Sequence, residues 1–158
     1  SAILKLKYVR TKIYRNAELD ALLCDALVDR AIVLHDDHND LNRALELANE
    51  AIRIMPDHIR ARRLLAMIYH NKAVAALNQK QMASASNYAN EALKYEKDPA
   101  TYRVLALALS QLNAWERAMD AATKALELDH SAESYALVSW LHMASAHNRA
   151  NSSPYWRY

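Results

Sequence analysis

The spacing of apolar residues divides the chain into a short first segment and a long helical part. In Leu4-Lys5-Leu6-Lys7-Tyr8, apolar and basic residues alternate with a period of two, which is typical of a β-strand. From Asn16 onward, apolar residues recur every three or four positions, which is the period of an amphipathic helix. We therefore predict an all-α protein in which only residues 1–15 are strand-like.

Polar runs and prolines mark the ends of seven predicted helices. Asn16 can cap the first helix, which ends at the polar run 35–40. Asp40 or Asn39 can cap the second, which stops before Pro56 because the residue preceding a proline disfavours helical backbone. The later helices are predicted at about 59–79, 82–96, 100–112, 115–128 and 132–148.

Three of the predicted helices, each the second of a consecutive pair, resemble one another in sequence. Each has one alanine, a second alanine seven residues later and then an aliphatic residue; the alanine pairs are Ala44/Ala51, Ala85/Ala92 and Ala118/Ala125. Small residues one heptad apart allow helix axes to approach closely. The repeating unit is therefore a helix–turn–helix of about 34 residues that stacks on its neighbours.

This unit resembles the tetratricopeptide repeat (TPR) family. The third repeat, 99–132, fits best: the family's first-helix positions hold Tyr102, Leu105, Ala106 and Leu109, and its small second-helix positions hold Ala118 and Ala125. Repeat one, 25–58, departs from the pattern at Ile32, and repeat two, 59–98, is several residues too long. The resemblance implies a right-handed helical solenoid of about 3.5 repeats.

Three segments follow from these boundaries. Residues 1–15 are predicted to be a basic linker or the remnant of a preceding domain, 16–148 the TPR-like domain and 149–158 a tail. Residues 1–15 carry a charge of +5, whereas the whole chain carries only +2. A basic arm for nucleic acid is the alternative interpretation of this first segment.

Composition excludes several chemistries. The chain contains no glycine, so a P-loop, a dinucleotide fingerprint, a nucleophile elbow and an EF-hand loop are all missing. We predict no enzyme activity and no cofactor, and expect Cys24 to be buried and inert among leucines. Asparagine tolerates left-handed backbone, so Asn39, Asn78 and Asn113 are expected to replace glycine at helix ends. A wider gap between helices is expected at Ile32.

The resemblance places the first helix of every repeat on a concave face that binds a peptide or protein. By register, its exposed positions are Asp29, Val33, Asp36, Arg60, Arg63, Met67, His70, Arg103, Leu107, Trp140 and Met143. The arginines are expected to hold partner carboxylates, and the Leu107–Trp140 end to take apolar anchors. Alternatively, these arginines only solvate a helix face. The two-carboxylate clamp of chaperone-binding members is expected to be missing, because Asp29 and Val33 occupy its first lysine and asparagine positions.

The segment His35–Asp40 holds two imidazoles and three carboxylates. At this spacing His35 and His38 can chelate a divalent metal, whereas a polar loop that caps helices explains the same residues without one. We predict no metal site and leave pH sensing by these histidines as a further alternative.

A more distant resemblance begins at Ile68. The lengthened second repeat and the Tyr102-led third resemble the helical C-terminal domain of CadC- and HilA-type bacterial transcriptional activators, in which an α/β segment precedes the repeats. It implies a sensory or effector domain that reaches DNA only through a domain outside this chain. The alternative is a free-standing adaptor or chaperone for secretion or envelope assembly. The bacterial cytoplasm is favoured over the periplasm, but the compartment is not decided.

The last predicted helix leaves Leu137, Trp140 and Leu141 at the end of the stack. Either the tail around Pro154-Tyr155-Trp156 covers them or another subunit does, and self-association through this helix is the prediction. No run of apolar residues is long enough to span a membrane.

Overall fold

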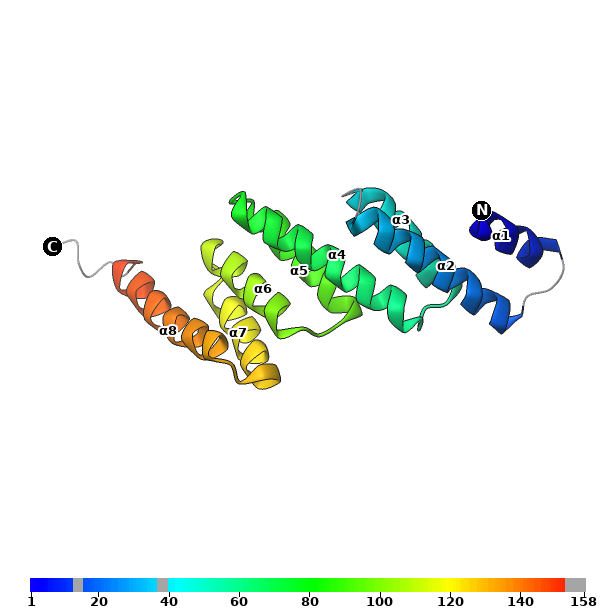
Figure 1. Ribbon diagram of the computed structural model, residues 1–158. Coiled ribbons are helices and arrows are strands. Elements are labelled where there is room, and N and C mark those ends of the chain that lie inside the picture. The colour runs from blue at the N-terminus through cyan, green and yellow to red at the C-terminus, as the bar shows by residue number, and fades with distance from the viewer. Residues whose placement is uncertain (13–15, 37–39, 153–158) are drawn as a thin grey trace. The chain divides into compact units, whose positions relative to one another are not determined.

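The computed structural model describes residues 1–12, 16–36 and 40–152, and these residues form helices and no strand. The helices are α1 (Ala2–Lys12), α2 (Ala17–Asp36), α3 (Leu41–Ile54), α4 (Ile59–Asn78), α5 (Met82–Tyr95), α6 (Pro99–Gln111), α7 (Trp115–Asp129) and α8 (Ala132–Ser152), shown in Figure 1. Seven of them lie close to the predicted positions. The all-α fold class is therefore confirmed.

The prediction of a strand near the N-terminus is wrong, because residues 2–12 form helix α1. The helical period places Leu4 and Leu6 on different sides: Leu4 is 67% exposed, whereas Leu6 is half-buried. Helix α1 packs against α2. Two of its basic residues meet acids of later helices, Lys7 with Glu50 at 2.7 Å and Arg10 with Asp20 at 2.6 Å. The basic charge of this segment is thus partly balanced within the chain.

The chain divides into two compact units, Ser1–Ile68 and Tyr69–Tyr158. Helix α4 contributes its first half to unit 1 and its second half to unit 2. Each unit is described by itself below.

In unit 1, helices α2 and α3 lie side by side along much of their lengths (Figure 1). The α2 face is built from large apolar residues such as Leu23 and Leu27, whereas α3 presents three fully buried alanines, Ala44, Ala48 and Ala51. Small side chains on one helix let the large ones on the other fill the interface. The repeated alanine pattern therefore marks close helix contact, as predicted.

Cys24 is completely buried in this interface. Its Sγ donates to the carbonyl oxygen of Ala51 over 3.4 Å. Burial raises the pKa of the Cys24 thiol, with the neighbouring carboxylate of Asp20 adding to the effect. The predicted burial of this cysteine is confirmed.

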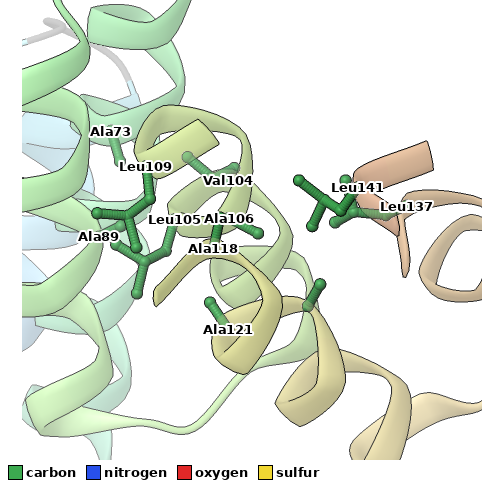
Figure 2. Close-up of a cluster of buried hydrophobic side chains, with 11 residues drawn as sticks. Ala73, Ala89, Val104, Leu105, Ala106, Leu109, Ala118, Ala121, Leu137 and Leu141 are labelled. Atoms are coloured by element: carbon green, nitrogen blue, oxygen red, sulfur yellow. The ribbon is translucent and has the colours of Figure 1, made fainter. Parts of the chain in front are cut away.

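Unit 2 has its core around α6, which packs against both α5 and α7. Leu105 and Leu109 of α6 lie near Ala89 of α5, and Leu137 and Leu141 extend from α8 (Figure 2). Helix α7 again presents alanines to the interface: Ala118, Ala121, Ala122 and Ala125 are all buried. The same division of large and small residues therefore recurs in this unit.

The helix starts follow the predicted caps. Asn16 Oδ1 accepts from the backbone N–H of Glu18 at 3.0 Å, and Asp40 Oδ1 accepts from that of Arg43 at 3.1 Å. These side chains satisfy amide groups that have no partner inside the first turn. Asn39, the alternative cap, lies outside the described residues.

The helix ends show how the chain turns without glycine. Lys80, Asn113 and His130 have left-handed backbone, with φ of 59°, 59° and 45°. After α4, the N–H of Gln81 bonds to the carbonyl of Ala76 at 2.9 Å; after α6, the N–H of Ala114 bonds to the carbonyl of Leu109 at 2.9 Å. This six-to-one bond defines a Schellman motif, which usually has glycine at the left-handed position.

The prediction of asparagine at helix ends is confirmed at Asn78 and Asn113, but only Asn113 has the left-handed backbone that glycine would have. Asn78 is the last residue of α4, and the left-handed position falls two residues later, at Lys80. The last carbonyl groups of α4 have no partner within the helix, and the N–H of Lys80 bonds to one of them, that of Leu77, at 3.0 Å. This bond places the turn at Lys80. Asn39 again lies outside the described residues.

Candidate partner-binding surface

The predicted first-helix positions lie on α2, α4, α6 and α8. Four large apolar residues among them are exposed at similar levels: Val33 38%, Met67 42%, Leu107 36% and Trp140 39%. Met143 is 67% exposed. Soluble proteins commonly expose single apolar side chains, so the exposure of these residues agrees with the predicted register but does not by itself assign them a role. The side chain of Asp36 lies outside the described part of the chain.

Unit 1 has two hollows beside α2. The first, here called the α4-side hollow, has a volume of ≈ 390 Å³ and is lined by Val28, Ile32, Arg60, Arg63, Leu64 and Met67. The second, the α1-side hollow, has a volume of ≈ 380 Å³ and is lined by Ser1, Ala2, Ile3, Ala26, Asp29, Arg30 and Val33. Both volumes lie within the range of ligand pockets in proteins. Ile32, where the repeat pattern departs from a small residue, thus lines a hollow.

A charged cluster joins α2 to the start of α4. The Arg60 guanidinium donates to Asp25 Oδ1 at 2.9 Å and to Asp29 Oδ1 at 2.5 Å. Hydrogen bonds to Asp29 and then Asp25 raise the pKa of Arg60. The same Asp25 oxygen lies 3.3 Å from His58 Nε2, while His58 Nδ1 accepts the Ala61 N–H at 3.3 Å and so caps α4.

This cluster changes the role expected of Arg60. A guanidinium bonded to two carboxylates of its own chain offers little to the carboxylate of a partner, because binding would require one of those bonds to break. Arg60 and Asp29 together therefore form a ridge of paired charges, here called the α2 ridge. Asp29 borders the α1-side hollow and Arg60 borders the α4-side hollow.

In unit 2, Arg103 also has an internal role. Its Nη1 donates to Asp129 Oδ2 at 2.6 Å and to Ser134 Oγ at 3.1 Å. Burial opposes ionisation of Asp129, but the backbone N–H of Ser131 and the side chains of Ser134, Arg103 and Ser131 outweigh it and hold the pKa of this carboxyl well below its usual range. Arg103 thus fastens the turn between α7 and α8 to α6.

His70 is likewise engaged inside unit 2. Its Nδ1 lies 2.8 Å from Thr101 Oγ1, and that hydroxyl donates to Asp98 Oδ2 at 2.9 Å. Because the hydroxyl has only one proton and the carboxylate can only accept, the network assigns the donor role to His70 Nδ1. The side chains of His70 and Arg103 therefore stabilise helix starts and turns.

Sequence reasoning missed part of the surface. The α1-side hollow includes Ile3, Ala26 and Arg30, none of which belongs to the predicted set. Residues 1–15 have no place in the repeat pattern, so that pattern does not predict a helix there. The cluster of basic residues in this segment was the one available signal, because Lys7 and Arg10 pair with acids of α3 and α2.

The remaining site predictions concern metals and membranes. Asp37, His38 and Asn39 of the His35–Asp40 cluster lie outside the described residues. Within the described ranges, no three His, Cys, Asp or Glu side chains are grouped to hold a metal ion. None of the helices described combines the length and the apolar character needed to cross a bilayer.

Comparison with known proteins supports the fold. No family model matches the chain, and no curated protein matches it. The C-terminal TPR-containing domain of a Plasmodium falciparum FK506-binding protein aligns with 85% of this chain and 96% of its own, at 16% identity and a TM-score of 0.57. The first TPR domain of human RPAP3 aligns with 84% of this chain and 99% of its own, at 18% identity and a TM-score of 0.53.

Both structures contain TPR domains, so the fold of this chain is a TPR-type helical repeat fold, as the sequence pattern predicts.

Proposed function

We propose that the chain is a non-catalytic interaction module whose unit 1 binds a segment of a protein partner across the α2 ridge. The observation that carries the proposal is the pair of hollows on the two sides of α2, with Val33 and Met67 exposed at their edges. Apolar hollows bordered by charged residues are typical of sites where a partner inserts anchoring side chains.

Unit 2 offers a second apolar surface at the equivalent register. Leu107 of α6 and Trp140 and Met143 of α8 are exposed there. Tryptophan and methionine are over-represented at protein interfaces because both bury much area for few polar atoms. We therefore include this surface as a secondary contact region of the same module.

Photocrosslinking tests the proposal. Benzoylphenylalanine placed at Met67 is expected to capture one defined partner in the host cell, and the same group at Leu128 of α7 is not. Leu128 is a matched control because it is 49% exposed, compared with 42% for Met67. Equal capture at both positions, or capture at neither, would contradict binding on this surface.

We also propose that this module is the sensory or effector part of a bacterial transcription regulator. The long second repeat supports this proposal, since α4 has 20 residues and α6 only 13. The helical structure of α1 removes one argument for this proposal. In such regulators an α/β segment precedes the repeats, which would have accounted for a strand at residues 4–8, but these residues form a helix. The alternative, an adaptor or chaperone, is tested by reading the gene upstream: a winged-helix sequence there supports a regulator.

Self-association through α8 stays a prediction, but two of the three residues expected at the open end of the stack, Leu137 and Leu141, are instead buried in the unit 2 core. Tyr135, Ser139 and His142 are exposed on α8 at positions equivalent to Tyr102, Ala106 and Leu109 of α6, two of which are buried. Serine and histidine thus replace apolar residues where α6 is covered by a neighbour. Sedimentation equilibrium at rising concentration measures whether Trp140 and Met143 still suffice for a dimer, and Trp140→Glu is expected to return the chain to a monomer.

A further inference from the structure

We infer that α8 of a second copy of this chain packs antiparallel on the outer face of α8. The outer face is the side opposite the buried residues Leu137 and Leu141, and its large apolar residues are Tyr135, Trp140 and Met143, which are 53%, 39% and 67% exposed. The inference rests on the self-association proposed above and specifies the face, the direction and the register of the pair. It also assigns an occupant to the secondary contact region of unit 2.

The composition of α8 is that of a helix covered on both sides. From Ser134 to Asn148, about four turns, the sequence contains no aspartate, glutamate, lysine or arginine. Helix α6 is similar, with Arg103 as its one charged residue, and it packs against α5, α7 and α8. Helix α7, by contrast, carries six charged residues. A helix face without charge and with three large apolar side chains exposed is typical of a surface that another molecule covers.

The outer face also has the spacing of a coiled-coil seam. Six residues follow one another at intervals of four and three positions, and all six are exposed: Ala132, Ala136, Ser139, Met143, Ala146 and Ala150. This alternation is the heptad pattern, in which side chains of one helix insert between those of the other. Because Met143 is the one large residue of the seam, the register of a pair depends on what Met143 faces.

The position of Met143 favours an antiparallel pair of copies. The middle of the seam lies between Ser139 and Met143, so a two-fold axis there places Met143 of each copy opposite Ser139 of the other. Ala136 then faces Ala146 of the second copy. Each layer contains a large and a small side chain or two small ones, which allows even packing. In a parallel pair, two Met143 side chains would meet in one layer and two serines in the next.

The flanks of the seam carry complementary groups in the same arrangement. Tyr135 and Arg149 lie on one flank, and the two-fold axis brings Arg149 of each copy beside Tyr135 of the other, as a cation–π pair requires. The hydrogen bond from Arg149 Nη2 to Ser145 Oγ is long, at 3.5 Å, and occupies only one of five N–H groups. In a parallel pair, the two arginines would lie at the same end and repel each other, and the helix dipoles would be parallel.

Sedimentation equilibrium of the full chain measures the association. A pair of helices about 31 Å long is a small interface, so we expect a monomer–dimer equilibrium in the micromolar range. Met143→Glu is expected to weaken the dimer by about tenfold or more, because it places a carboxylate in the seam. Met67→Glu is the matched control, an exposed methionine of α4. A chain that stays monomeric at about 100 μM, or equal effects of the two variants, would overturn the inference.

A mixture of two variants tests the register. Met143→Glu and Ser139→Lys each place two like charges in the seam of their own dimer. Mixed in equal amounts, they are expected to associate about tenfold more tightly than either alone, because the glutamate of one faces the lysine of the other. Met143→Glu mixed with Ala146→Lys is the control, since this lysine lies one heptad further along in the antiparallel pair. If the control mixture associates equally well, the register is wrong.

Cysteine cross-linking tests the direction with substitutions too small to disturb the fold. Chains with Ala136→Cys are mixed with chains with Ala146→Cys and treated with a short bismaleimide. The mixture is expected to form covalent dimers and either variant alone few, because two copies of position 136 lie ten residues, about 15 Å, apart in the antiparallel pair. Thr123→Cys, exposed on α7, is the control, and Cys24 is fully buried in all variants. A parallel pair would give the reverse result and refute the inference.

The outcomes separate this inference from the proposed function of unit 1. A monomeric chain that still captures a partner at Met67 refutes the dimer and leaves the unit 1 site intact. A dimer with the expected cross-links and no capture at Met67 refutes the unit 1 site alone. If benzoylphenylalanine at Met143 captures a different protein while the isolated chain is monomeric, that protein covers the outer face and the second copy does not.

Discussion

Arg103 on α6 and Asp129 at the end of α7 are joined by a hydrogen bond of 2.6 Å between Nη1 and Oδ2. Ser131 and Ser134 complete the network, with Ser134 Oγ donating to Asp129 Oδ1 at 2.8 Å. The carboxylate of Asp129 therefore connects three helices of unit 2, namely α6, α7 and α8. An arginine that the sequence suggests for partner binding is engaged in the internal structure.

Replacing Asp129 by asparagine is expected to destabilise the chain, because the variant keeps the size of the side chain but loses its charge. Urea unfolding followed by circular dichroism at pH 7 measures the loss as a lower midpoint. Asp120→Asn is the control: Asp120 is exposed on the same helix and makes no ion pair within the described residues. An unchanged midpoint for Asp129→Asn would contradict the role given to the network.

The pH dependence of this effect follows from the direction of the pKa shift. Asp129 has a lower pKa in the folded chain than in the unfolded chain, where aspartate titrates near 3.9. The unfolded state therefore takes up the proton first as the pH falls. We expect the difference between unmodified chain and Asp129→Asn to be complete above about pH 5 and to shrink as the pH falls below about 4. A difference that grows in acid would contradict this assignment.

Thr101→Val is expected to cost about 1–2 kcal/mol, because valine keeps the shape of threonine but leaves His70 Nδ1–H without its acceptor. The carboxylate of Asp98 also loses the hydroxyl that donates to it. Thr123→Val on the exposed face of α7 is the control and is expected to change the free energy of unfolding by less than about 0.5 kcal/mol. Equal effects would show that the buried hydroxyl has no special role.

Ala122→Leu is expected to destabilise the chain by about 1–3 kcal/mol. Ala122 is completely buried in the unit 2 core, where a larger side chain would force α7 away from its neighbour. Thr123→Leu places the same residue on the exposed side of the helix and should leave stability nearly unchanged. Thermal unfolding of both variants measures the difference, and a stable Ala122→Leu variant would show that the contact is looser than the structure indicates.

Lys80→Gly is expected to stabilise the chain by about 1 kcal/mol, because left-handed backbone costs a residue with a side chain about 1–2 kcal/mol and glycine far less. Asn113→Gly should gain less, since asparagine already tolerates this conformation. Ala75→Gly, at an exposed position inside α4, is the control and should cost about 1 kcal/mol. Chemical denaturation of all three variants measures the order; a loss of stability in Lys80→Gly would contradict the argument.

Local patterns were enough to predict most of the fold. The alanine spacing locates close helix contacts at Ala51 and Ala118, and the cap residues Asn16 and Asp40 fix helix starts, because both effects depend on a few neighbouring residues. Helix α1 was missed because its alternation over five residues fits a strand and the acidic partners of Lys7 and Arg10 belong to other helices. The pattern of a short sequence segment does not show which residues of other helices will pair with it.

The sequence predicts which residues of the candidate site are exposed, but not which of its charged residues are paired within the chain. Register alone correctly placed Val33 and Met67 at the surface. Register does not show which charged residues already have partners in the same chain. Arg60 and Arg103 are both held by aspartates, at separations of 35 and 26 residues from Asp25 and Asp129, and only the folded structure brings these pairs together.

The ion pairs around the two hollows make the unit 1 surface sensitive to ionic strength. One wall of the α1-side hollow is the start of α1, which is connected to later helices by Lys7–Glu50, a partly exposed pair, and by Arg10–Asp20. Salt screens exposed pairs strongly, with a Debye length of about 10 Å at 0.1 M and about 3 Å at 1 M. The α4-side hollow has buried apolar residues such as Leu64 in its interior, but its border includes Arg60, whose pairs with Asp25 and Asp29 are also exposed. The salt content of the medium is therefore expected to act on the charged borders of both hollows and little on their apolar interiors.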